Sequence, residues 1–184
     1  MGNLFNDKYR IDSIRLPGWD YGSVDRYFVT ICTKNRECFF GNIVNGKMQL
    51  SEIGEIVKTE WIKTKQLRKN IELDEFTIMP DHFHGILVIN VISVETPRNS
   101  CKGVARNAFT KNHMSRISPK SRTLSTIIRS FKSAITRQCR QMSFHNFAWQ
   151  SRFYEHIIRN KFELNRIREY IMNNPLKWHL DCNK

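Results

Sequence analysis

The sequence IELDEFTIMPDHFHGILVINV at residues 71–91 decides the fold. Residues 71–79 and 82–91 are both rich in β-branched and aromatic side chains, which is typical of strands. Pro80 and Asp81 between them form a turn too short for the crossover connection of a parallel pair. The two strands are therefore predicted to be antiparallel neighbours.

Further elements are predicted on both sides of this strand pair. Residues 24–33 have the composition of another strand, and Asn45 with Gly46 is a hairpin signal between short apolar pieces. Apolar side chains at the helical period predict one helix that begins after Ser51 and another at 123–142. The predicted fold class is α+β: a single domain over residues 1–184, with a mainly antiparallel sheet and helices packed on one face.

A last helix is predicted from about 161 to 174. Asn160 is its expected N-cap, Glu163 occupies the capping-box position, and Pro175 is expected to end it. Tyr170 and Asn174 are one turn apart on this helix, so the phenol and the carboxamide share a side. Considered alone, Tyr170 is most simply a half-buried aromatic and Asn174 a helix-ending residue.

The charge of the chain is distributed unevenly. Residues 1–97 carry 12 Lys and Arg against 13 Asp and Glu, whereas residues 98–184 carry 18 against 4. Such one-sided charge is typical of a surface that faces a polyanion, and nucleic acid is the first expectation. Residues 95–122 lack periodicity and predict a mobile basic loop. The expected nucleic-acid-binding side chains are Arg129, Lys132, Arg137, Arg140 and Arg152.

Several classes of protein are excluded by composition. The longest apolar run, at 86–89, is too short to cross a bilayer, and no secretory signal follows the N-terminus. Five cysteines are scattered and never form a Cys-x-x-Cys pair, which argues against a disulfide framework and a structural zinc site. A cytoplasmic location and no membrane partner are expected.

His82 and His84 open the strand predicted at 82–91. Alternate residues of a strand point to the same face, so both imidazoles lie together and Phe83 points into the opposite layer. Two neutral imidazoles at the mouth of a buried strand are well placed to share a cation. A pair of hydrogen-bonded structural histidines is the alternative.

Three segments together resemble a known family. They are MPDHFHGI at 79–86, WQSRFYEHIIRN at 149–160 and RIREYIMNNPLK at 166–177. The first resembles the His-hydrophobic-His signature of single-tyrosine transposases, and the other two resemble blocks of one branch, the REP-associated tyrosine transposases. The resemblance runs from about residue 24 to residue 178, and it implies a ferredoxin-like sandwich around an antiparallel sheet.

By that resemblance, His82, His84 and Asn174 would bind a divalent metal ion, magnesium or manganese, and Tyr170 would be the nucleophile. Tyr154, inside the second block, is the alternative nucleophile; Tyr170 is preferred because Asn174 one turn away can also reach the metal. The implied activity is cleavage and strand transfer of single-stranded DNA hairpins through a 5′-phosphotyrosine, at the bacterial nucleoid. A monomer and a homodimer are both compatible with the sequence.

Two other functions remain open at this point. One is a non-catalytic nucleic-acid-binding module, although the sequence lacks the paired exposed aromatics of RNA-binding sheets. The other is a nucleotide phosphoesterase with a histidine nucleophile, which is expected to pair two separate histidine motifs.

Overall fold

The computed structural model describes residues 19–91 and 123–181. In these ranges the central sheet has four strands, in the order β4-β5-β1-β6, and every neighbouring pair is antiparallel. The strands are β1 (Asp25–Cys32), β4 (Ile71–Ile78), β5 (His82–Ile89) and β6 (Tyr154–Ile158). The helices are α1 (Glu52–Leu67), α3 (Leu124–Gln141) and α4 (Lys161–Asp181).

The chain order β1-α1-β4-β5-α3-β6 with this strand order is the ferredoxin-like arrangement. The predicted antiparallel pairing of the two strands around Pro80 is confirmed, and so is the α+β class. Met79 closes the turn between them by donating its backbone N–H to the carbonyl of His82 at 2.8 Å. This turn fixes which face of the sheet each residue of β5 occupies.

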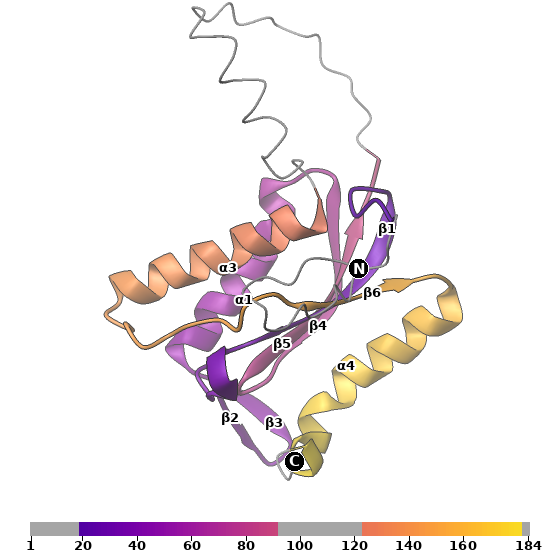
Figure 1. Cartoon of the computed structure of the whole chain (residues 1–184). Coiled ribbons are helices and arrows are strands. Elements are labelled where there is room, and N and C mark those ends of the chain that lie inside the picture. The colour runs from indigo at the N-terminus through magenta and orange to yellow at the C-terminus, as the bar shows by residue number, and fades with distance from the viewer. Residues whose placement is uncertain (1–18, 92–122, 182–184) are drawn as a thin grey trace, which may run out of the picture.

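One face of the sheet is covered by α1 and α3, as predicted (Figure 1). The main core lies between the sheet and these two helices, and it consists of inward residues of β1 and β5 packed on both helices. Trp61, Phe83 and Phe131 are at its centre, with ring centroids 4.6 to 5.7 Å apart. Their burial anchors β5 and thereby fixes the residues that alternate with Phe83 on the other face.

The opposite face is covered by α4, which corrects the expectation that the helices pack on one face (Figure 1). Phe28, Ile86 and Ile158 on this face pack with residues of α4 in a second core. The reason is that the central strands are apolar on both faces, so a single helical layer leaves one apolar face in water. The apolar residues that α4 contributes are Leu164, Ile167 and Ile171.

Local signals in the sequence account for the turns and helix starts. Asn45 and Gly46 both have positive φ, of 52° and 72°, and join β2 (Gly41–Val44) to β3 (Lys47–Leu50) as predicted. Ser51 accepts a hydrogen bond from the Gly54 N–H at 3.1 Å and caps α1. Asn160 likewise accepts from the Glu163 N–H at 2.8 Å, so its predicted capping role is confirmed.

Pro175 does not end α4, and the predicted stop there is wrong. Proline removes one backbone donor and disturbs the preceding turn, but later turns keep their hydrogen bonds when other contacts hold them. Two such contacts follow Pro175: Leu176 packs against Gly46 of the hairpin turn, and the Trp178 ring lies 6.1 Å from the His82 ring.

The short helix η2 (Lys34–Arg36) follows β1 and carries Arg36 in the left-handed region, with φ of 58°. The basic loop expected at about 95–122 lies outside the described residues. Within the part of the chain that the structure describes, no helix is long and apolar enough to span a membrane.

Candidate active site

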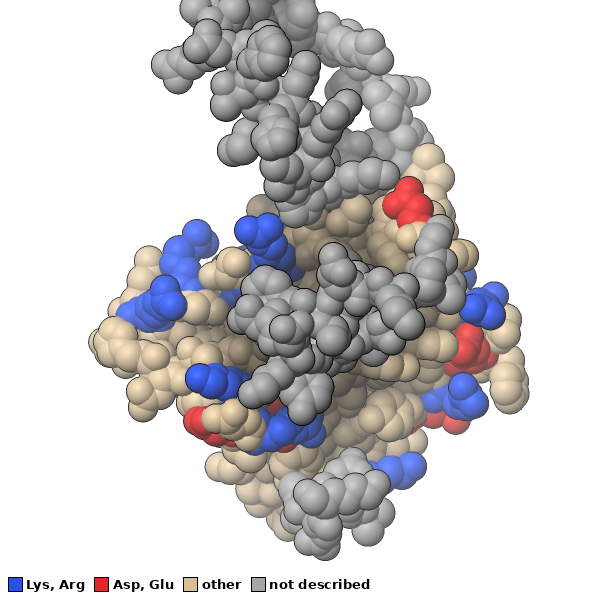
Figure 2. Space-filling view, in the orientation of Figure 1, with Lys and Arg blue, Asp and Glu red and all other residues tan. Residues whose placement is uncertain are grey.

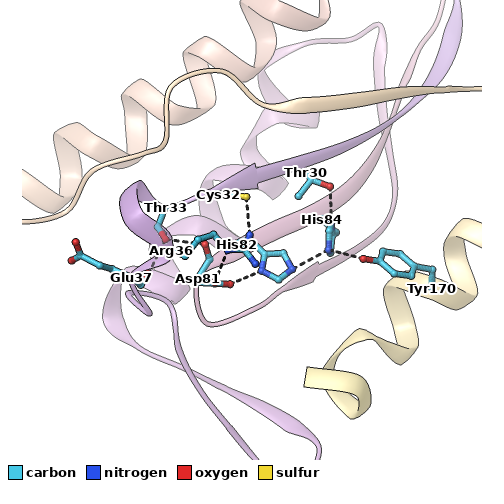
Figure 3. Close-up of polar contacts among 9 residues, drawn as sticks. All are labelled: Thr30, Cys32, Thr33, Arg36, Glu37, Asp81, His82, His84 and Tyr170. Atoms are coloured by element: carbon cyan, nitrogen blue, oxygen red, sulfur yellow. Dashed lines mark hydrogen bonds and ion pairs between the residues drawn. The ribbon is translucent and has the colours of Figure 1, made fainter. Parts of the chain in front are cut away.

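His82 and His84 lie together on the α4 face of β5 (Figure 3). Both side chains are buried, and their Nε2 atoms are 3.0 Å apart. Because a neutral imidazole has a lone pair on one nitrogen only, two facing lone pairs at this distance repel unless a proton or a cation lies between them. The geometry of the pair fits either one hydrogen bond between the two rings or one cation bound by both of them.

The second nitrogen of each ring is held by a neighbour. His82 Nδ1 lies 2.5 Å from Asp81 Oδ1, and His84 Nδ1 lies 2.8 Å from Thr30 Oγ1 (Figure 3). A carboxylate accepts a hydrogen bond from the N–H of Nδ1, which leaves the lone pair of His82 on Nε2. Asp81 and Thr30 thus orient both rings so that Nε2 points to the shared position.

The electrostatic environment keeps His84 neutral. Burial, together with smaller effects of His82 and the charge of Arg36, lowers the pKa of His84 from 6.5 to about 2. Since a neutral imidazole is the form that ligates a cation, His84 is available as a donor throughout the physiological pH range.

Asp81 is itself anchored by a set of contacts that sequence reasoning missed. Its Oδ2 lies 2.8 Å from Arg36 Nε, and its backbone carbonyl accepts hydrogen bonds from the hydroxyl and the N–H of Thr33. Arg36 also donates to the sulfur of Cys32 at 2.9 Å (Figure 3). The sequence signal that could have revealed the role of Asp81 is its position directly before the histidine pair.

Tyr170 of α4 lies beside the pair. Its hydroxyl is 3.4 Å from His84 Nε2, and its ring meets Phe28 edge to face at a centroid distance of 6.1 Å. The side chain is 46% exposed, so the hydroxyl is within reach of a substrate. The structure therefore brings together three of the predicted site residues from two distant segments of the chain.

A cleft of about 730 Å³ opens over these groups. Tyr154 of β6, the alternative nucleophile, lines the cleft too. The lining residues are Phe28, Thr30, Arg36, Cys38, Asp81, His82, His84, Tyr154, Tyr170 and Trp178.

Asn174 is not among the residues that line the cleft. It is 3% exposed, and its side-chain oxygen is buried with no hydrogen-bond partner in the described part of the chain. A buried amide oxygen without a partner costs free energy, which a bound cation nearby would remove. Its place on α4, one turn from Tyr170, is compatible with the predicted role as third ligand.

The donors present fit a divalent metal ion. Two nitrogens bound at right angles to one ion, with bonds of about 2.1 Å, are about 3.0 Å apart. Both rings also have the outer hydrogen bonds that metal-binding histidines need. No cluster of three or more His, Cys, Asp and Glu side chains forms a metal site within residues 19–91 and 123–181. Further ligands would thus be the Asn174 oxygen, solvent or substrate, and imidazole donors favour manganese over magnesium.

Comparison with known proteins places the chain in a family. No family model matches it. An uncharacterized protein of Haemophilus influenzae is 39% identical over 171 residues, which are 92% of this chain and 90% of that protein. The chain belongs to the family of this Haemophilus protein.

A solved structure shows the same fold. It is that of a REP-associated tyrosine transposase bound to a REP hairpin, and it aligns with 91% of this chain and 74% of its own. The TM-score is 0.57 and the sequence identity is 21%. The chain therefore has a transposase-like fold.

The predicted nucleic-acid-binding residues of α3 lie on the other side of the sheet from the cleft. Arg129, Arg137 and Arg140 are exposed there, and Figure 2 shows several separate blue side chains among tan ones in the region of α3. Lys132 instead makes contacts within the protein: its Nζ donates to the carbonyls of Gln150 at 2.7 Å and Arg152 at 3.0 Å. Burial lowers the pKa of Lys132, in keeping with this structural contact.

Proposed function

We propose that the protein is a metal-dependent tyrosine transposase that cuts and rejoins single-stranded DNA. The observation that carries the proposal is the Tyr170 hydroxyl, 3.4 Å from His84 Nε2, which is in turn 3.0 Å from His82 Nε2. A nucleophile and a cation-binding pair in one cleft are what phosphoryl transfer by covalent catalysis requires.

In the proposed reaction Tyr170 attacks a phosphodiester of the DNA. A bond forms between the phenolic oxygen and phosphorus, and the bond from phosphorus to the 3′ oxygen breaks. The phenol loses its proton and the departing 3′ oxygen gains one, so the products are a free 3′-hydroxyl and a 5′-phosphotyrosine. Phe28 holds the Tyr170 ring edge to face and limits the positions that its hydroxyl can take.

His82 and His84 would hold the metal ion, with Asn174 as the third donor. A bound divalent ion supplies Lewis-acid stabilisation of the charge that develops on the phosphate oxygens. Asp81 and Thr30 keep the two imidazoles aligned for this task, which reduces the reorganisation needed when substrate binds.

The choice of tyrosine suits a reaction that must be reversed. A phenol has a pKa near 10, well below that of an alcohol, so its phosphate ester stays reactive toward a returning 3′-hydroxyl. Cleavage by Tyr170 can therefore be resealed without ATP, as strand transfer requires. The fold shared with a transposase bound to a REP hairpin supports a DNA hairpin as the substrate.

A gel assay with manganese and single-stranded hairpin oligonucleotides tests the proposal. Cleavage by Tyr170 predicts that a 3′ label moves to the mass of the protein, while a 5′ label appears on a shorter free strand. Tyr170→Phe, His82→Ala and added EDTA should each abolish the adduct. An adduct that survives in Tyr170→Phe and disappears in Tyr154→Phe would assign the nucleophile to Tyr154.

Two other results would contradict the proposal. Tight binding without any cleavage over a varied set of oligonucleotides would indicate a binding module. Hydrolysis of a nucleotide phosphoester that depends on His82 and not on Tyr170 would indicate a histidine phosphoesterase.

A further inference from the structure

We infer that the cleft binds one nucleobase on each side of the reacting phosphate, one against Tyr154 and the other against Trp178. The inference rests on the proposed function, because it takes single-stranded DNA as the substrate. Neither residue has a role in the proposed chemistry, yet both line the cleft around His82 and His84.

The cleft is lined by a series of aromatic rings. Tyr154 meets Phe28 at a centroid distance of 6.4 Å, and Phe28 stacks on His84 at 5.4 Å. His84 is followed by His82 at 4.5 Å, and His82 by Trp178 at 6.1 Å. Tyr154 and Trp178 are thus the two ends of the series, with the site of phosphoryl transfer between them.

Tyr154 is placed by the sheet. It pairs with Thr30 on β1, and Thr30 pairs with His84 on β5, so Tyr154 and His84 lie at the same level two strands apart. Its ring touches Phe28 by an edge-to-face contact, and the side chain is 50% exposed. A half-exposed ring braced on one side is suited to stack with a base on the other.

Trp178 is placed by the turn of α4 that continues beyond Pro175. The indole lies against His82, which is two residues nearer the start of β5 than His84, and it is half-buried. It therefore flanks the histidine pair on the side away from Tyr154. Indole is a large flat surface, and stacking on aromatic rings tolerates every base because each base has a π-face.

The charges of the cleft also favour binding through the bases. Among the described residues that line the cleft, Arg36 is the one Lys or Arg, and Asp81 offsets its charge through an ion pair at 2.8 Å. The described lining residues therefore offer few contacts to phosphates, and their affinity for a single strand has to come largely from the bases.

Anisotropy measurements on the full chain test the inference. The probes are fluorescein-labelled dT12 and mixed-sequence 12-mers, with EDTA present so that no cleavage occurs. Tyr154→Ala and Trp178→Ala should each raise Kd about 5- to 150-fold, the range of one lost base stack. The slope of log Kd against log salt should stay unchanged, because no phosphate contact is removed.

Matched variants separate stacking from other effects. Tyr154→Phe keeps the ring and should bind like the wild type within about twofold. Phe162→Ala removes an aromatic side chain of α4 that is 80% exposed and does not line the cleft, and it should leave Kd unchanged. Trp178→Leu keeps apolar volume for packing and should still lose affinity, which distinguishes stacking from a defect in folding.

The outcomes for the inference and for the proposed function are distinct. Wild-type affinity in both Tyr154→Ala and Trp178→Leu would overturn the inference, even if a Tyr170 adduct forms. A Tyr154→Phe variant that binds like the wild type but forms no adduct would overturn the choice of Tyr170 as nucleophile and would support the stacking role of the Tyr154 ring. Absence of binding by the wild type to every probe would overturn both proposals.

Discussion

Arg168 of α4 contacts Asp74 of β4 through two nitrogen atoms, with Nε 2.9 Å from Oδ1 and a terminal nitrogen 2.6 Å from Oδ2. Burial opposes the ionisation of Asp74, but the hydrogen bond and charge of Arg168, with the Glu75 N–H and the charge of Arg26, together outweigh it and lower the pKa of this carboxyl. The pair joins the edge of the sheet to the helix that carries Tyr170, so it helps to hold the phenol beside His84.

Arg168→Gln should destabilise the protein more at neutral pH than in acid. Because the pKa of Asp74 is lower in the folded protein than in the unfolded chain, the ion pair contributes stability above about pH 4 and loses it as the pH falls through the lowered value. The expected loss is about 1 kcal/mol at pH 7, since the pair is partly exposed. Urea unfolding at pH 7 and pH 3 checks both values; an equal loss at the two pH values would contradict the role of Asp74.

Asp81→Asn should weaken manganese binding by about 10- to 100-fold, because the carboxylate orients His82 and raises its donor strength. Isothermal titration with MnCl₂ and no DNA measures this directly. Glu37→Gln removes an exposed carboxylate from a residue near Arg36 that does not line the cleft, and it serves as the control. Equal manganese affinities in the two variants would show that Asp81 does not support metal binding.

Asn174→Ala tests whether this residue is a metal ligand or has only a structural role in α4. The free energy of unfolding without metal should change by less than about 1 kcal/mol, because the buried oxygen has no hydrogen-bond partner to lose. Manganese affinity should fall about tenfold if that oxygen is a ligand, which corresponds to about 1.4 kcal/mol. Asn173→Ala, at an exposed neighbouring position of α4, is the control. Affinity that does not change in Asn174→Ala assigns the residue to the helix alone.

Gly85→Ala should destabilise the protein by about 1–3 kcal/mol through overpacking. A Cβ atom at this position would lie 2.8 Å from Phe83 Cε1 and 2.8 Å from Trp61 Cζ2, both in the main core. Chemical denaturation measures the loss. The exposed Gly22→Ala, where the nearest atom is an Asp20 oxygen at 3.3 Å, should change stability by less than about 0.5 kcal/mol.

Changing Arg129, Arg137 and Arg140 together to Gln should reduce the salt dependence of single-stranded DNA binding. Each lost phosphate contact lowers the slope of log K against log salt by about 0.7. Lys132 is left intact because its ammonium holds residues 150–152 in place. The three Arg→Lys changes keep the charge and should keep the slope. An undiminished slope in the Gln variant would exclude this side of α3 from the DNA interface.

Residues with strong local signals were predicted correctly from the sequence. The turn at Pro80, the hairpin at Asn45 and Gly46 and the caps at Ser51 and Asn160 each depend on a few neighbouring residues, and the structure confirms them. The shared face of His82 and His84 follows from the two-residue period of a strand. These features need no information about distant parts of the chain.

Features that depend on distant contacts were missed. β6 has five residues, and what identifies it as a strand is its pairing with β1. The path of α4 beyond Pro175 and its position across the sheet depend on Trp178, Leu176 and the second core. Arg36 joins the site only because η2 brings it back to Asp81, 45 positions away, a contact that local patterns do not contain.

The position of the sheet between the α3 arginines and the cleft limits the length of nucleic acid that can reach both. A strand that occupies both surfaces must run around an edge of the sheet, past a helical layer about 10 Å thick and half a sheet about 10 Å wide. The shortest route is therefore about 20 Å, and a shorter oligonucleotide occupies one surface at a time. In the proposed reaction, binding of a long substrate by α3 and cutting of its end in the cleft would therefore be separable, so changes on α3 would alter the length of DNA that is bound and leave the chemistry unchanged.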